Sequence, residues 1–134
     1  MRYAIDAATL VALAQDPRTM ADHRLVAPNS LRTRALELVL SQVRAGTLAE
    51  QDVRGLHDRI TEIPVRLLGD RVSRGRAWRL AREADWPDLQ DAELLAVAVL
   101  QADALVTADP ELISKADGLV PVADFDALFV PDPA

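Results

Sequence analysis

The sequence contains a short apolar run that ends in an aspartate, Ala104-Leu105-Val106-Thr107-Ala108-Asp109. A second run of this kind, Tyr3-Ala4-Ile5-Asp6, lies near the start of the chain. Short apolar runs bounded by polar residues are typical of strands that are buried on both faces. Because helical patterns separate these runs, the sequence predicts an α/β fold, a short parallel sheet flanked by helices on both faces.

The other elements are predicted from apolar periodicity and from breaking residues. Helices are expected at 8–15, 31–45, 47–60, 70–84, 89–101 and 111–115. Further strands are expected at 25–27 and 119–122, an extended crossing at 63–65 and a turn at 124–129.

Three local features carry more specific expectations. Asn29 or Ser30 is expected to cap the second helix. The spacing of Thr47-Leu48-Ala49-Glu50 is that of a capping box and predicts the start of the third helix. Trp78 is expected in the core, on the apolar face of the helix at 70–84.

The composition limits the class of protein. The 134 residues fit a single domain, 1–134, in which 130–134 are expected to be a frayed tail. Fifteen basic and 21 acidic residues give a net charge of −6, which argues against coating of nucleic acid by a basic surface. The absence of cysteine excludes disulfides, cysteine-held zinc and thiol nucleophiles. An early acid and the lack of any apolar run of about 18 residues argue against a signal peptide and a membrane span, so the cytoplasm is the expected compartment.

Two of the acids are predicted to share a site. Asp6 and Asp109 each follow an apolar strand, and the carboxyl ends of parallel strands border the crevice in which ligands bind. Asp91, with Glu93 two residues later, begins the helix that leads into the strand at 104. Clustered carboxylates repel one another unless a cation neutralises them, and hard oxygen ligands favour Mg²⁺ or Mn²⁺. Metal-assisted phosphodiester hydrolysis is therefore the expected reaction class.

Each acid taken alone also has a purely structural explanation. Asp6 and Asp109 suit the N-caps of the helices that follow them, and Pro110 suits a first helical turn. Asp91 suits a first turn because the helix dipole favours an acid there. The functional interpretation rests on the three acids together.

An arginine cluster stands out in this acidic chain, at positions 66, 71, 74, 76, 79 and 82. It is either a solvated helix face or a patch that steers RNA phosphates. Trp86, in a loop near the predicted site, either packs in that loop or stacks on a base.

In order along the chain, these motifs resemble the PIN-domain ribonucleases, and most closely the VapC-type toxins of bacterial toxin–antitoxin pairs. The resemblance rests on the aspartate after the first strand, on Val26-Ala27-Pro28 before a helix that ends at Gly46, on Asp91-Ala92-Glu93-Leu94-Leu95-Ala96 and on the run 102–109. It implies a PIN-like three-layer fold and an endoribonuclease that depends on Mg²⁺ or Mn²⁺. It also implies an RNA substrate, a homodimer and a cognate antitoxin.

Carried over by position, the resemblance makes Asp6, Asp91 and Asp109 the metal ligands. Some members carry the second acid at the position of Glu93, and this sequence has both. Thr107 matches a hydroxyl that often accompanies the last aspartate, and it either orients a carboxylate or water or is an ordinary strand residue.

One position departs from the family pattern. The family usually places a glutamate early in the second helix, where this sequence has Arg34, and Glu37 follows three residues later on roughly the same face. Either Glu37 replaces that glutamate, or Arg34 points a cation at the acids and weakens metal binding, or both make surface pairs. The departure motivates an alternative function, a catalytically weak PIN-like module that binds RNA or protein. A phosphotransfer receiver domain ranks last, because the expected acidic pair and late lysine are missing.

Overall fold

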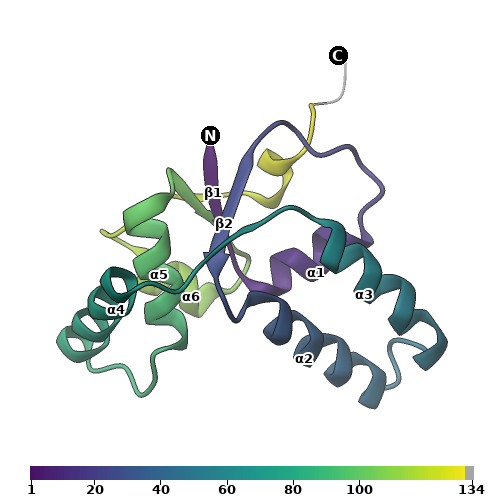
Figure 1. Ribbon diagram of the computed structural model, residues 1–134, viewed down its shortest axis with the longest axis horizontal. Helices are drawn as coiled ribbons and strands as arrows, with labels where there is room; N and C mark the ends of the chain where they lie inside the picture. Colours follow the sequence, from purple (N-terminus) through teal and green to yellow (C-terminus); the bar gives the residue numbers. More distant parts are fainter. Residues whose placement is uncertain (132–134) are drawn as a thin grey trace.

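The computed structural model describes residues 1–131 as a parallel sheet of five strands between two layers of helices (Figure 1). The strands are β1 (Arg2–Ile5), β2 (Arg24–Pro28), β3 (Arg66–Leu68), β4 (Ala104–Val106) and β5 (Val122–Ala123). The α-helices are α1 (Ala7–Gln15), α2 (Leu31–Arg44), α3 (Val53–Glu62), α4 (Arg71–Ala84), α5 (Gln90–Gln101) and α6 (Pro110–Ala116). Short 3₁₀ helices are η1 (Glu50–Asp52) and η2 (Phe125–Leu128).

The strand order is β3-β2-β1-β4-β5, with β1 at the centre. From β1 the chain builds one half of the sheet through β2 and β3, and later returns to the other side of β1 with β4 and β5. In sheets of this kind the ligand crevice lies where the strand order reverses, beyond the carboxyl ends of the strands. That point lies between β1 and β4, where Ile5 pairs with Val106.

The side chains of the central strands alternate between two cores. Tyr3 and Ile5 point into a core shared with α1, α2 and α3, whereas Ala4 points into a core shared with α4, α5 and α6. Leu105 on β4 also faces the second core. Because apolar side chains leave both faces of the sheet, helices must cover both, and the predicted α/β fold is confirmed.

Aspartates begin three of the helices. The side chains of Asp6, Asp70 and Asp109 accept hydrogen bonds from the backbone N–H groups of Thr9, Ser73 and Glu111, at 2.9, 2.8 and 3.0 Å. The N-cap roles expected for Asp6 and Asp109 are therefore confirmed, and neither role prevents the remaining oxygens from facing a ligand.

One local prediction is wrong, and the predicted N-cap position of α2 is confirmed without a side-chain hydrogen bond. The capping box does not form: Thr47 donates its hydroxyl to Gln42 O at the end of α2, and α3 begins only at Val53 after a 3₁₀ turn. The hydroxyl satisfies a free carbonyl at a helix end, so it is not available to start the next helix. Ser30 occupies the N-cap position of α2 but forms no side-chain capping bond.

The strands at the sheet edges also differ from expectation. β3 begins after the predicted extended crossing at 63–65, and β5 shares only Val122 with the predicted strand 119–122 and continues to Ala123. Edge strands pair on one side only, so their bounds depend on the neighbouring strand more than on their own apolar pattern. β3 follows the register of β2, with Leu68 opposite Pro28.

Trp78 is not in the core. Its residue is 60% exposed, while Ser73, Ala77, Leu80 and Ala81 on the same helix are buried. These four positions already form a complete helical stripe against α5 and the sheet, and Trp78 is about 100° further around the helix from Ala77. A small-residue stripe rather than the tryptophan is what packs α4.

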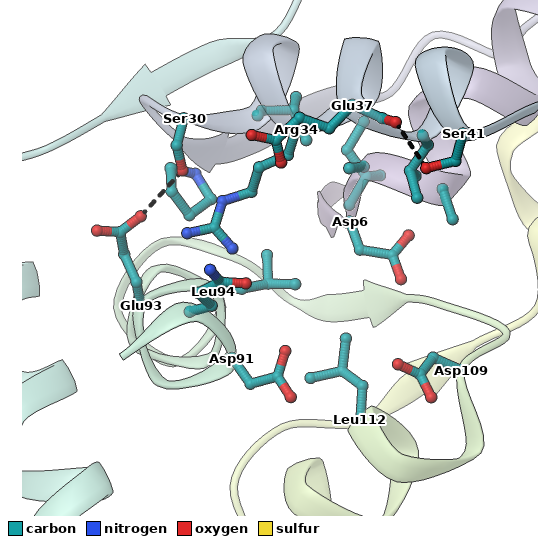
Figure 2. A pocket seen from close by; sticks show the side chains of 17 residues that line it. Asp6, Ser30, Arg34, Glu37, Ser41, Asp91, Glu93, Leu94, Asp109 and Leu112 are labelled. Atoms are coloured by element: carbon teal, nitrogen blue, oxygen red, sulfur yellow. Dashed lines mark hydrogen bonds between the residues drawn. The ribbon is translucent and has the colours of Figure 1, made fainter. Parts of the chain in front are cut away.

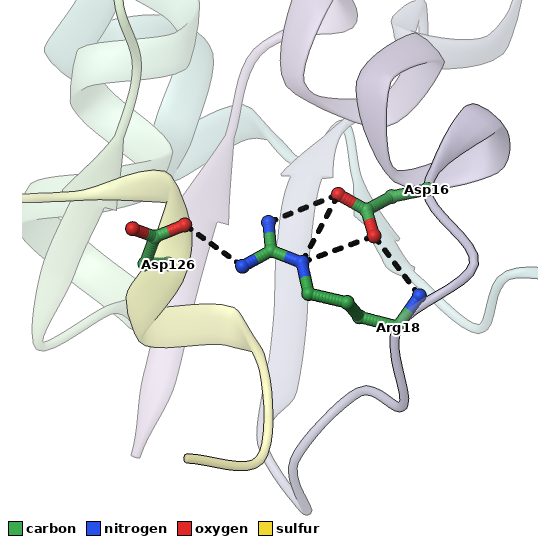
Figure 3. A network of polar contacts seen from close by, with 3 residues as sticks. All are labelled: Asp16, Arg18 and Asp126. Carbon is green, nitrogen blue, oxygen red and sulfur yellow. Dashed lines mark hydrogen bonds and ion pairs between the residues drawn. The ribbon is translucent and has the colours of Figure 1, made fainter. Parts of the chain in front are cut away.

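The segment around η2 is fastened to the end of α1 (Figure 3). Arg18 forms ion pairs with Asp16 at 2.9 Å and Asp126 at 3.0 Å, and its guanidinium lies 3.9 Å from the centre of the Phe129 ring. Val130 donates its N–H to Thr19 O, so the expected frayed tail does not begin there; positions 132–134 of it lie outside the described residues. Among residues 1–131, no helix has the length and apolarity to cross a membrane.

Candidate functional site

A cavity of about 440 Å³ lies beyond the carboxyl ends of β1 and β4, between the starts of α1, α2, α5 and α6 (Figure 2). Every acid singled out in the sequence lines it: Asp6, Glu37, Asp91, Glu93 and Asp109. Asp91 and Glu93 share α5, whereas Asp6 caps α1, Glu37 lies on α2 and Asp109 caps α6, and the fold brings these four helices to one place. Arg34 also lines the cavity.

Asp6 is held by uncharged donors at both of its carboxylate oxygens. Oδ1 accepts from the Thr9 N–H at 2.9 Å, and Oδ2 accepts from the Thr107 hydroxyl at 2.6 Å. Thr9 in turn donates its own buried hydroxyl to Val106 O, which ties the start of α1 to β4. The carboxylate therefore has a defined orientation, and neither of its donors is a cation.

Thr107 connects two of the predicted ligands. Its hydroxyl donates to Asp6 and also accepts from the Asp109 N–H at 3.1 Å. The residue is buried, so this hydroxyl is protected from exchange with solvent partners. Of the roles considered for Thr107, the structure shows the one in which the hydroxyl contacts a carboxylate.

Asp109 is the N-cap residue of α6, and its side chain points toward the same cavity (Figure 2). One oxygen accepts from the Glu111 N–H, and α6 begins with Pro110, which lacks an N–H of its own. The second oxygen takes no part in that capping bond. Asp109 can therefore serve the helix and a ligand together.

Asp91 is held by a charged partner. Its Oδ2 accepts from Lys115 Nζ at 2.8 Å, and the lysine side chain is only 17% exposed. The ammonium also lies 3.3 Å from Glu111 Oε1 and 5.2 Å from the centre of the Trp86 ring. The hydrogen bond to Asp91, more than the contact with Glu111, raises the pKa of Lys115 against the opposing effect of burial. Lys115 is thus positively charged at neutral pH.

Glu93 is oriented toward a different edge of the cavity from Asp91. The two lie about 200° apart around α5, and Glu93 Oε1 accepts from the Ser30 hydroxyl at 3.3 Å. This contact explains why Ser30 leaves α2 without a side-chain cap. Both acids line the cavity, so the choice between them stays open.

Arg34 and Glu37 both reach the cavity from α2. Figure 2 shows the Arg34 side chain extending from the helix into the space between Glu93 and Asp6. Within residues 1–131, no ion pair engages its guanidinium. Glu37 forms no ion pair either, so the alternative in which both residues make surface pairs is not seen in the described part of the chain.

Sequence reasoning missed the role of Lys115. The residue is the only lysine in the chain, which was a usable signal, but it is 24 positions from Asp91. Only the packing of α6 beside the start of α5 brings the two together. Trp86, half-buried against the second core, supports the same lysine.

No protein-family model matches the sequence, and no curated protein matches it significantly. Solved structures do match. The crystal structure of PAE2754 from Pyrobaculum aerophilum is 24% identical over 96% of this chain and 95% of that chain, with a TM-score of 0.68. A chain of the 2.2 Å structure of VapBC-1 from nontypeable Haemophilus influenzae is 14% identical over 93% of this chain and 98% of that chain, with a TM-score of 0.56.

The chain has a PIN-like fold. The similarity covers nearly all of this chain and of both matched chains, so it extends over the sheet and both helical layers. At these identities the similarity shows the fold alone, and the side chains that line the cavity determine which chemistry it can support.

The acids suit a hard divalent cation, because Mg²⁺ and Mn²⁺ prefer carboxylate oxygens as ligands. As the side chains stand, residues 1–131 contain no group of three or more His, Cys, Asp or Glu close enough to hold a metal ion. Asp91 Oδ2 is engaged by Lys115, so an internal ammonium already occupies one of the carboxylates that the sequence predicts as a ligand.

Proposed function

We propose that this chain is a metal-dependent endoribonuclease, the toxin of a VapBC-type toxin–antitoxin pair. One observation carries the proposal: Asp6, Asp91 and Asp109 converge on one cavity at the switch point of a PIN-like sheet. The similarity to a chain of the VapBC-1 structure supports it. The expected cofactor is Mg²⁺ or Mn²⁺, held by these three aspartates, and the expected compartment is the cytoplasm.

A divalent cation bound there supplies an activated water and neutralises charge on the scissile phosphate. The chain supplies orientation. Thr9 N–H and the Thr107 hydroxyl hold the Asp6 carboxylate, so it needs little rearrangement. Arg34 is the cation placed to donate hydrogen bonds to a phosphate oxygen, which offsets repulsion between an RNA backbone and an acidic cavity. Glu37 and Glu93 are further carboxylates at the same cavity that can accept a proton.

An acidic cavity also favours a particular inhibitor. A basic segment of an antitoxin complements the five carboxylates and can neutralise them as a bound cation would. We therefore include a cognate antitoxin and a homodimer in the proposal.

One specific observation favours a second candidate, a PIN-like module that binds RNA or protein without cleaving. Lys115 on Asp91 and Arg34 inside the cavity already place two cations among the acids. If they neutralise the site sufficiently, no metal binds.

The test is titration of Mg²⁺ and of Mn²⁺ into the purified chain by calorimetry, with RNA cleavage measured on the same samples. Asp6→Asn is the test variant. Asp58→Asn, at an exposed position on α3, is the matched control. Binding and cleavage that vanish in Asp6→Asn alone support the nuclease. An absence of metal binding in the wild type contradicts it and supports the binding module.

A further inference from the structure

The exposed tryptophan of α4 has no partner in the fold. Of the two tryptophans, Trp86 packs against the second core, whereas Trp78 is 60% exposed. A single exposed leucine is ordinary on a protein surface, but a large aromatic ring in a charged setting is a marker of binding.

Trp78 lies in the middle of an arginine stripe. Arg71, Arg74, Trp78 and Arg82 are spaced by three, four and four residues, so they lie on one face of α4, and all four are exposed. The face extends about 16 Å along the helix. We call it the α4 stripe.

The charge of this helix is opposite to that of the chain. α4 carries five arginines and one acid, Glu83, in a protein of net charge −6. Within residues 1–131, no carboxylate forms an ion pair with any of these arginines. Arg74 donates instead to Gly69 O at the start of the helix. In the described part of the chain, the stripe therefore presents, around an aromatic ring, guanidinium groups that form no ion pair.

We propose that the α4 stripe binds single-stranded RNA, an inference that rests on the proposed function and names a surface outside its cavity. Every base has a flat face that can stack on the Trp78 indole, and guanidinium groups bind phosphates on either side. A second copy of this chain is a poorer occupant, because an isologous contact here brings arginines against arginines. Trp78 is also the only apolar residue of the stripe.

The stripe leads toward the cavity. α4 packs beside α5, the helix of Asp91 (Figure 1). Its first turn follows Gly69, where an added Cβ would lie 2.0 Å from Asn29 Nδ2, so the backbone there rests against Asn29. The next residue, Ser30, lines the cavity. RNA that runs along the stripe from Arg82 to Arg71 thus arrives at the Ser30 edge of the site.

The test measures RNA binding without metal, so it does not depend on cleavage. A fluorescein-labelled oligouridine is titrated with the chain in EDTA, and its anisotropy is followed. Trp78→Ala is expected to weaken binding about tenfold, and Trp78→Phe to retain most of the affinity. Arg82→Gln is expected to lower the slope of log affinity against log salt by about 1, while Arg54→Gln on α3, an exposed control, leaves it unchanged.

Light scattering on the same variants separates RNA binding from self-association. A loss of affinity in Trp78→Ala at unchanged mass supports the inference. Unchanged affinity overturns it, and so does a loss that occurs only together with a loss of dimer mass, which would make this face an interface between copies. Because these measurements exclude metal, a failure of the nuclease proposal shows separately, as absent metal binding in calorimetry.

Discussion

The two ends of the cavity hold their carboxylates by different means. At one end, Asp6 accepts from a backbone N–H and from the Thr107 hydroxyl, which carry no net charge. At the other end, Asp91 accepts from the Lys115 ammonium, and the positive charge of the lysine balances the negative charge of the carboxylate. Both are orderly arrangements of a carboxylate at the start of a helix, and they differ in what remains available to a ligand.

Neutral donors orient a carboxylate and leave its charge in place, whereas an ion pair orients it and removes its charge. In the proposed nuclease, a cation that enters the cavity therefore meets an Asp6 carboxylate without a charged partner and competes with Lys115 for Asp91. The affinity of the proposed metal site is set mainly by the Asp6 end and limited by Lys115. Each prediction below alters one side of this contrast.

The largest effect is expected from Asp6→Asn. The amide oxygen can still accept from Thr9, so the α1 cap survives and the unfolding free energy should change by less than about 1 kcal/mol. The lost charge should lower the cleavage rate by at least ~100-fold, more than the loss of a supporting residue does. Thermal unfolding and a cleavage assay check the two parts. A variant that cleaves at the wild-type rate would remove Asp6 from the site.

Thr107→Val is expected to give the next largest effect. Valine has the same shape but no hydroxyl, so Asp6 loses its Oδ2 donor and the Asp109 N–H loses its acceptor. Loss of such a supporting contact typically reduces metal affinity or activity about 10–100-fold. Calorimetric titration with Mn²⁺ measures it. Thr107→Ser, which keeps the hydroxyl, should behave as the wild type, and equal losses in both variants would contradict the argument.

Lys115→Met is expected to act in the opposite direction. Methionine fills the place of the aliphatic stem but leaves Asp91 unpaired, so the local negative charge rises. The affinity for Mg²⁺ should increase roughly tenfold, about 1.4 kcal/mol, because a like charge a few ångströms from the ion has been removed. Lys115→Arg keeps the charge and should show no gain. A lower affinity in Lys115→Met would mean that Lys115 orients Asp91 rather than competing for it.

The smallest effect concerns two acids that do not line the cavity and that repeat the contrast. Asp70 accepts from Ser73 as Asp6 does from Thr9, and Asp16 pairs with Arg18 as Asp91 does with Lys115. These contacts lower the pKa of both carboxyls below 3.8, mainly through Ser73 for Asp70 and Arg18 for Asp16. A lowered pKa in the folded state means that stability present at neutral pH is lost as the pH falls through that pKa.

Chemical denaturation between pH 5 and pH 2.5 checks this, in the wild type and in Asp70→Asn and Asp16→Asn. Each variant should lose less stability on acidification than the wild type. Added salt should diminish the Asp16 contribution more than that of Asp70, because only the former is an ion pair at the surface. Equal salt sensitivity would break the analogy between the two pairs.

The acids of the site were predictable from sequence because each follows a simple local rule. Asp6 and Asp109 come directly after apolar strands, and Asp91 begins an apolar helix. The parallel sheet then brings the strand ends together whatever the lengths between them. The central strands and most helices also follow local apolar patterns, so their bounds were predicted nearly to the residue.

What could not be predicted depends on neighbours far along the chain. Nothing near Lys115 indicates Asp91, and the lysine acquires its role from the packing of α6 beside α5. Trp78 was assigned to the core by its hydrophobicity, but Ala77 and Ala81 allow α4 to pack closely and leave no room that the indole could fill. The short β3 has a mixed sequence, and its pairing with β2 makes it a strand.

The position of β1 at the centre of the sheet has a consequence for synthesis. Its partner β4 begins at Ala104, about a hundred residues later, so the first strand of this sheet to be synthesised waits for one of the last. Nearly the whole chain has to emerge before the sheet closes, and such long-range pairing is slow. Only then can the Thr107 hydroxyl donate to the Asp6 carboxylate, and only then does Asp109 line the same cavity as Asp6. A nascent chain therefore has no assembled acid cavity until the β4–α6 segment has been translated, and the proposed activity cannot begin before then.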